Sequence, residues 1–185
     1  MTEAELVDAL KSRFTRGMAQ RYGQAIVESD LFCVALDLGL DANRAVAFHA
    51  SYALERAFFM APDQFDSHVA HFVENYLVAT NPSTHRHYSK IMAHLLGCGR
   101  VVLDDVQRQQ VAEATFDRLI DPEVRPGVKV WAMEILANVS KNLSWVNEQL
   151  YDTIQFQMRH GEPALCSRGR KICRRILAQH ANGGE

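Results

Sequence analysis

The segment Val130-Trp131-Ala132-Met133-Glu134-Ile135-Leu136 carries a pattern that recurs along the chain. Its small residue Ala132 is followed three and four positions later by apolar residues. Similar segments, with apolar or small residues at both later positions, are Phe48–Leu54, His87–Ala93 and, more weakly, Ser167–Cys173. The small central residues recur after 39, 43 and 37 residues. Self-similarity near forty residues in a chain with helical patterning predicts a stacked array of helix pairs.

The helix expected over 127–141 has two apolar sides rather than one. At about 100° per residue, one broad stripe contains Val128, Trp131, Ala132, Ile135, Leu136, Val139 and Leu143. A second strip contains Val130, Met133 and Ala137. Such a helix is expected to lie between its pair partner and the next repeat. The small central residues Ala50, Ser89 and Ala132 would let neighbouring helices approach closely.

The sequence lacks the signals of β-strands, namely a sustained alternation of apolar and polar residues and Asn-Gly or Asp-Gly hairpin turns. We therefore predict helices throughout the chain. The five prolines fall between apolar-periodic segments, as expected of residues that interrupt helix interiors. The adjacent acids Asp104 and Asp105 favour a helix start, where negative charge suits the helix dipole. Helices are expected near residues 3–20, 22–28, 30–39, 43–60, 64–79, 83–97, 103–120, 127–141, 145–159 and 164–180.

Charge and cysteine content exclude several classes of protein. The 185 residues include 20 basic and 22 acidic side chains, and the formal net charge of −2 gives no overall attraction to nucleic acid or membranes. Cys33, Cys98, Cys166 and Cys173 show no CxxC spacing, and the chain lacks the cysteine density of a disulfide scaffold. A signal-peptide pattern is missing, and no apolar stretch approaches the roughly 18 residues of a membrane span. We therefore expect a cytoplasmic protein with reduced thiols.

The forty-residue helix pairs resemble HEAT or armadillo repeats, and the stretch from Arg44 to Leu177 is similar to small uncharacterised bacterial HEAT-like proteins. The segments that carry the resemblance are Arg44-Ala45, Ala61-Pro62-Asp63, Val128–Leu136 and Ser167–Ile172. It implies an all-α fold, a right-handed α-solenoid of stacked antiparallel helix pairs, in a single domain over 1–185. We expect N-terminal helices in 1–40, repeats at about 42–80, 82–121 and 122–160, and a capping helix at 163–180.

HEAT-like repeats in general imply a scaffold that binds proteins, or sometimes nucleic acid, along a curved surface. We therefore expect a non-catalytic protein–protein interaction scaffold without a cofactor, whose partner the sequence does not identify. The candidate contact residues are the polar stripes that remain on the second helices once the core is assigned. They are Gln107, Gln110, Asp117, Glu148, Asp152 and Gln155.

The strongest local charge lies on the last expected helix. Its cations are Arg168, Arg170, Lys171, Arg174 and Arg175, joined by Arg159 and His160 from the preceding helix end. One interpretation is an anion-binding or nucleic-acid-binding surface, because guanidinium groups match phosphate oxygens well. The other is a capping helix whose polar outer face closes the array and whose cations complement the helix dipole.

Other residues with chemical potential are interpreted as structural. Tyr88 and Trp131 occupy equivalent motif positions, and the apolar stripe around Trp131 favours packing over base stacking. The basic residues His85 and Arg86 are expected to be solvated. His68 and His71 lie one turn apart, but without a third strong ligand they indicate a solvated helix edge rather than a metal site.

Enzyme motifs are missing from the sequence, including a glycine-rich phosphate loop, GxSxG and HExxH. We therefore assign no catalytic or metal-binding residue. A DNA-repair glycosylase of HEAT-like fold is the weaker alternative, because such enzymes use tryptophans and a carboxylate. Here the two tryptophans are Trp131 and Trp145, and no partner carboxylate matches.

Overall fold

A computed structural model describes residues 1–159 and 161–182, with side chains as far as Ala178. These residues form helices and no strand, which confirms the predicted all-α class. The chain forms two compact units, residues 1–91 and 92–185, and the division falls inside helix α7 (Pro82–Gly97). Each described helix is too short or too polar to cross a lipid bilayer.

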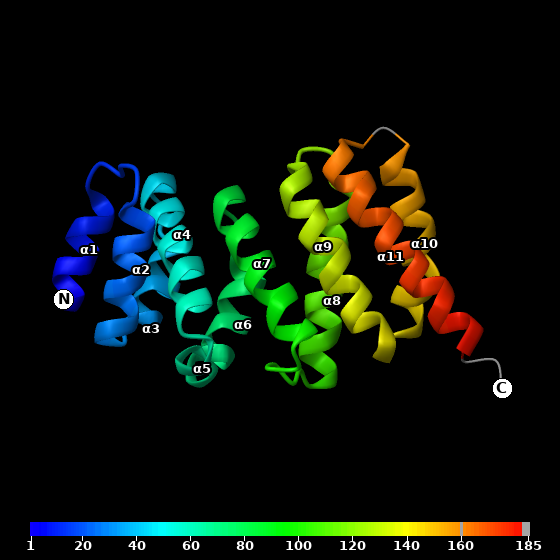
Figure 1. Ribbon diagram of the computed structural model, residues 1–185, viewed down its shortest axis with the longest axis horizontal. Coiled ribbons are helices and arrows are strands. Elements are labelled where there is room, and N and C mark those ends of the chain that lie inside the picture. Colours follow the sequence, from blue (N-terminus) through cyan, green and yellow to red (C-terminus); the bar gives the residue numbers. More distant parts are fainter. Residues whose placement is uncertain (160, 183–185) are drawn as a thin grey trace. The chain divides into compact units, whose positions relative to one another are not determined.

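The first unit is built around the long helix α4 (Arg44–Met60), which packs against α2 (Met18–Ser29) and α3 (Phe32–Leu38) (Figure 1). The other elements before α7 are α1 (Glu3–Lys11), α5 (Pro62–Phe65), the 3-10 turn η1 (Asp66–His68) and α6 (Val69–Val78). Fully buried aromatic side chains occupy the core, and their large apolar area supplies much of its stabilisation. They are Phe32, Phe58, Phe65, Phe72, Tyr76 and Tyr88.

The second unit consists of two layers of helices. Its elements are α8 (Asp105–Ile120), α9 (Pro126–Val139), the 3-10 turn η2 (Ser140–Asn142), α10 (Ser144–Met158) and α11 (Pro163–Asn182). Helix α9 packs against both α8 and α11, and α10 packs against both α11 and α9. In Figure 1, α9 and α11 lie in front of α8 and α10. Helix α9 is covered on more than one side, and none of its residues after Gly127 is exposed.

The small residues at the centre of the repeated segments are buried, as the sequence predicts. Ala50, Ser89 and Ala132 have no exposed surface. Gly169 on α11 is also buried, and a Cβ atom placed there would lie 2.6 Å from the Sδ atom of Met158. A larger side chain at these positions would overfill the helix interfaces.

The aromatic residues of the same segments differ from each other. Tyr88 is fully buried, and its hydroxyl donates a hydrogen bond of 2.8 Å to the carbonyl oxygen of Leu36. The prediction that Tyr88 is a packing residue is therefore confirmed. Trp131 is only half-buried, and the guanidinium of Arg168 lies 5.2 Å from the centre of its ring.

The single helix expected over residues 3–20 is wrong. Helix α1 ends at Lys11, and α2 begins only at Met18. Between them, Phe14 stacks on the ring of His49 with 4.4 Å between ring centres. Gly17, the N-cap of α2, has a φ angle of +87°, a left-handed conformation that favours glycine and that a continuous helix would not contain. A tertiary contact and a backbone turn thus override the apolar periodicity.

The helix expected over residues 64–79 is divided into α5, η1 and α6. The tight 3-10 turn lies between Phe65, which packs edge-on against Phe58, and Phe72, which continues the same core. By contrast, the predicted helix start at Asp104 is confirmed. The Asp104 side chain accepts a hydrogen bond of 2.7 Å from the backbone N–H of Gln107 and caps α8.

Candidate protein-interaction surface

One side of α8 exposes polar and apolar residues at helical spacing. The exposed stripe contains Val106, Gln110, Glu113, Asp117 and Ile120. Its apolar ends are well exposed, with 67% of Val106 and 55% of Ile120 accessible to solvent. Intervals of three and four residues place these side chains on one face. The opposite side of α8 is buried against α9.

Helix α10 exposes a comparable stripe. Glu148, Asp152 and Phe156 follow one another at intervals of four residues, and all three are exposed. Phe156 is the most prominent, because 64% of this large apolar residue is accessible. Val146, Leu150 and Ile154 of the same helix are buried on the other side.

The two stripes flank the contact between α8 and α10. The indole N–H of Trp145 donates a hydrogen bond of 3.0 Å to Oε1 of Gln109. The Trp145 ring also lies 5.4 Å from the ring of Phe116. These contacts hold the start of α10 beside α8. We call the eight stripe residues of α8 and α10 the acidic face.

Four of the six predicted contact residues lie on the acidic face, namely Gln110, Asp117, Glu148 and Asp152. The other two are engaged within the protein. Gln107 accepts a hydrogen bond from the backbone N–H of Asp104 in the capping box of α8. Gln155 lies 3.7 Å from the sulfur of Cys173, to which its amide donates.

Sequence reasoning missed the residues that complete the acidic face, which are Val106, Glu113, Ile120 and Phe156. The three apolar ones resemble core residues in composition. Their spacing could have identified them, because each apolar residue lies three or four positions from a polar residue of the same stripe and therefore on the same side of the helix. Exposed apolar groups beside charged ones are typical of surfaces that bind a partner.

The cations predicted at the C-terminal end, on α11 and just after α10, fall into two groups. Arg168 and Arg175 both contact the carboxylate of Glu134 on α9, at 2.5 Å and 3.1 Å. Arg159, Arg170, Lys171 and Arg174 are exposed instead. His160, the remaining predicted member of this group, lies outside the described residues. Two of the predicted anion-binding cations therefore already have a carboxylate partner within the protein.

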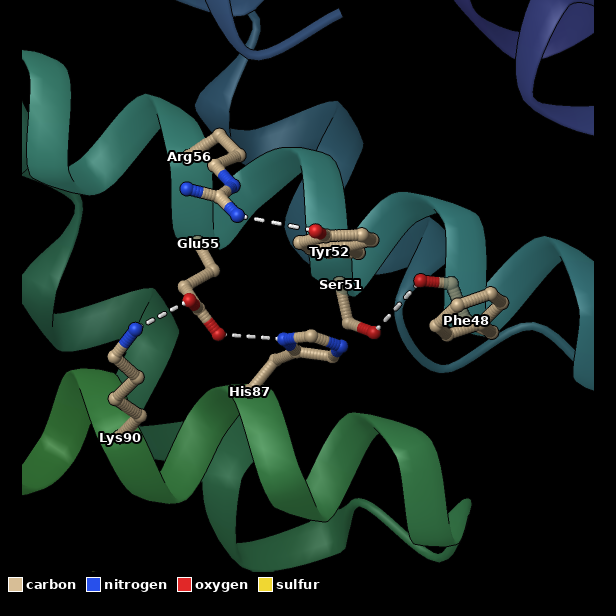
Figure 2. A network of polar contacts seen from close by, with 7 residues as sticks. All are labelled: Phe48, Ser51, Tyr52, Glu55, Arg56, His87 and Lys90. Atoms are coloured by element: carbon tan, nitrogen blue, oxygen red, sulfur yellow. Dashed lines mark hydrogen bonds and ion pairs between the residues drawn. The ribbon is translucent and has the colours of Figure 1, made fainter. Parts of the chain in front are cut away.

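A second feature is a buried polar network in the first unit, shown in Figure 2. Glu55 on α4 and His87 on α7 each have only 8% of their side chain exposed. Nδ1 of His87 lies 2.6 Å from one carboxylate oxygen, and the ammonium of Lys90 lies 2.6 Å from the other. The ring of Tyr52 stacks on His87 with 5.0 Å between ring centres.

Burial would raise the pKa of Glu55, but the hydrogen bonds and charges of His87 and Lys90 outweigh it. The net effect is a pKa below the usual 4.5, so Glu55 stays ionised. Both carboxylate oxygens have a partner on α7. The network therefore acts as a structural link between α4 and α7.

The solvated helix edge expected for His68 and His71 is wrong in the case of His68. Its side chain is 13% exposed, with Nε2 3.0 Å from Asp30 and Nδ1 3.3 Å from the sulfur of Cys33. His71 lies 2.7 Å from a carboxylate oxygen of Asp37. Asp30 and Asp37 come from the α2–α3 region. The spacing of the two histidines in the sequence gives no sign of these distant partners. Within the described residues, they do not complete a group that could hold a metal ion.

The neighbours of Cys33 affect the pKa of its thiol. Burial, followed by the negative charges of Asp37 and Asp30, raises its pKa above 9.0. The nucleophile in cysteine chemistry is the thiolate, whose population falls as the pKa rises. The geometry of Cys33, His68 and Asp30 is therefore that of a hydrogen-bonded helix junction.

A cleft of about 250 Å³ lies in the second unit beside the start of α8. Its polar lining includes Arg108, Asn138, Lys141 and Asn142. The guanidinium of Arg108 already donates to Asp105 and to the carbonyl oxygen of Leu103. The cleft thus offers one other cation and two amides, which do not define a reaction.

The chain matches no protein-family model, no curated protein and no solved structure. A functional proposal must therefore come from the residues of this chain. Among the surfaces described, the acidic face combines clustered charge with exposed apolar groups most clearly.

Proposed function

We propose that the chain is a short HEAT-like α-solenoid that acts as a non-catalytic protein-interaction scaffold. The acidic face of α8 and α10 is the observation that carries this proposal. It presents four carboxylates, from Glu113, Asp117, Glu148 and Asp152, together with exposed apolar side chains. These groups are spread over a surface instead of converging in a pocket, which suits binding better than catalysis.

The partner that fits this face is a basic amphipathic helix. Its cations would pair with the four carboxylates, and its apolar side would cover Phe156, Ile120 and Val106. Charged groups at the rim of such an interface mainly set specificity and association rate. The apolar contacts would supply most of the affinity, because they are removed from water. Aromatic residues such as Phe156 are enriched at protein interfaces.

A fluorescence-anisotropy titration tests the partner chemistry. The probe is a labelled synthetic helix of about 18 residues with lysines on one side and leucines on the other. We expect saturable binding that weakens at least ~10-fold in the double variant Asp117→Lys with Asp152→Lys. Asp8→Lys with Glu74→Lys is the matched control, because both residues are exposed in the first unit. Equal binding by both double variants would contradict the proposal.

The solenoid itself can be tested by small-angle X-ray scattering. A compact globule of this length has a radius of gyration of about 16 Å. A stack of helix pairs is elongated and should give a clearly larger value with an asymmetric distance distribution. A radius at the compact value would argue against the array. The buried small residues on α4, α7, α9 and α11 support stacking of neighbouring helices.

A second candidate function is nucleic-acid binding by α11. The observation that favours it is the exposed row of Arg170, Lys171 and Arg174 on a helix without any acidic residue. Gel shifts with mixed DNA and RNA should then show binding that falls steeply with salt. The variant Arg170→Ala with Arg174→Ala should lose this binding. Nucleic-acid binding by α11 would be excluded if the native chain did not bind at low salt, or if this variant still bound.

A further inference from the structure

The exposed stripes of α8 and α11 share the same residue spacing with opposite charge. On α8, two acids and one apolar residue follow at intervals of four and three residues, namely Glu113, Asp117 and Ile120. On α11, two bases and one apolar residue follow at the same intervals, namely Arg170, Arg174 and Leu177. Because the helical rise is 1.5 Å per residue, the two patterns match in length as well as in order.

Helices laid side by side in the same direction would bring these groups into register. Arg170 would lie opposite Glu113, and Arg174 opposite Asp117. Leu177, which is 53% exposed, would lie against Ile120, which is 55% exposed. Lys171 lies next to Arg170 on the exposed side and would extend toward the carboxylates of α10. The acidic face therefore fits the exposed side of α11 in charge and in apolar pattern.

The two stripes of one molecule cannot satisfy each other. The opposite side of α11, with Ile172, Cys173 and Ile176, is buried in the second unit. Helix α11 packs there against α9 and α10. Its basic side consequently points to solvent. An α11 able to reach the acidic face must come from another molecule.

We propose that the partner of the acidic face is α11 of a second copy of this chain. The two surfaces are different, so the contact is heterologous and leaves one unused surface of each kind in a dimer. Further copies add head to tail. The inference rests on the proposed function, because it names the occupant of the same face. It also gives the exposed cations of α11 a role that requires no nucleic acid.

The association should be weak and sensitive to salt. The ion pairs lie at exposed positions, where each contributes little, and the apolar contact is small. Screening acts over about 8 Å at physiological ionic strength, so salt should reduce the attraction between the two surfaces. Sedimentation velocity of the full chain at low salt should show a weight-average mass that rises with concentration and falls again when salt is added.

Charge reversal on either side tests the contact. One variant carries Arg170→Glu with Arg174→Glu, and the other carries Glu113→Lys with Asp117→Lys. Each alone should weaken self-association at least ~10-fold, because equal charges then face each other. A mixture of the two variants should restore a complex. All four residues are exposed, so the fold is expected to tolerate these changes.

The control is Asp8→Lys with Glu74→Lys, which changes the net charge as much as the acidic-face variant does. It should associate like the native chain. A native chain that stays monomeric at low salt would overturn the proposal, as would reversed variants that associate normally. If nucleic acid binds α11 and no self-association occurs, the proposal also fails. The lysine–leucine helix would still test the acidic face separately, so the two failures are distinguishable.

Discussion

Glu55 is an ionised carboxylate whose burial is offset by two partners on another helix. His87 and Lys90 lie 32 and 35 residues further along the chain. Spacing within α4 therefore gives no sign of the network. The same holds for His68, whose partners Asp30 and Cys33 come from the α2–α3 junction. Polar partners from distant segments are the part of this structure least accessible to sequence reasoning.

Replacing Glu55 by Gln should destabilise the protein by roughly 3 kcal/mol, because two partners lose a buried charge. Urea unfolding measures the change, with the exposed Glu74→Gln as control. The pKa of Glu55 is lowered in the folded state, so its contribution is present above pH 4.5 and lost as pH falls below it. The gap between native and variant stability should therefore narrow in acid. A gap independent of pH would contradict this assignment.

The raised pKa of Cys33 predicts slow alkylation near neutral pH. The rate should still be rising at pH 9.0 and level off only at higher pH, because burial and the charges of Asp37 and Asp30 keep the thiol protonated. Mass spectrometry of the peptide that contains Cys33, after iodoacetamide treatment at a series of pH values, measures the profile. Asp37→Asn should move the profile to lower pH, because one of the negative charges disappears. A profile that levels off below pH 9.0 in the native chain would contradict the raised pKa.

At the scale of helices, periodicity and capping predicted more than individual contacts. The helix bounds expected near 43–60, 83–97 and 103–120 lie within two residues of α4, α7 and α8. In both failures an aromatic residue near the interruption packs against a distant helix. Phe14 does so before α2, and Phe65 does so before α6. Tertiary packing there outweighs local helical preference.

The contact between α2 and α4 depends on a residue without a side chain. A Cβ atom at Gly23 would lie 2.7 Å from Cβ of Arg56 and 3.0 Å from the backbone nitrogen of Ala57. Gly23→Ala should therefore cost about 1 to 3 kcal/mol through overpacking, measured by thermal or urea unfolding. Gly127→Ala is the control, because nothing lies within 4 Å of that position. Similar effects of both substitutions would contradict the close approach.

At the scale of the whole molecule, a formal net charge of −2 conceals strong local separation of charge. The acidic face carries four carboxylates, while α11 carries five cations and no acid. The sequence predicted the all-α class, the buried small residues and four members of the acidic face. It did not show that Arg168 and Arg175 are held by Glu134, because that contact spans 34 and 41 residues.

This separation predicts unusual behaviour in ion exchange. At pH 7 and low salt, the native chain should bind a cation exchanger through α11 despite its net negative charge. Arg170→Glu with Arg174→Glu should pass through the column. Lys11→Glu with Arg21→Glu changes the net charge equally at exposed positions of the first unit and should still be retained. If both variants lost retention, net charge alone, rather than the cations of α11, would determine binding to the cation exchanger.

The segment between α1 and α2 contains two sites where trypsin could cleave the first unit. Arg13 and Arg16 are exposed on either side of Phe14, whose ring is stacked on His49. Trypsin needs a locally extended backbone at an arginine, and the stacked ring holds this backbone in place. The nicking rate at these two arginines is therefore a direct gauge of how often the Phe14–His49 stack opens.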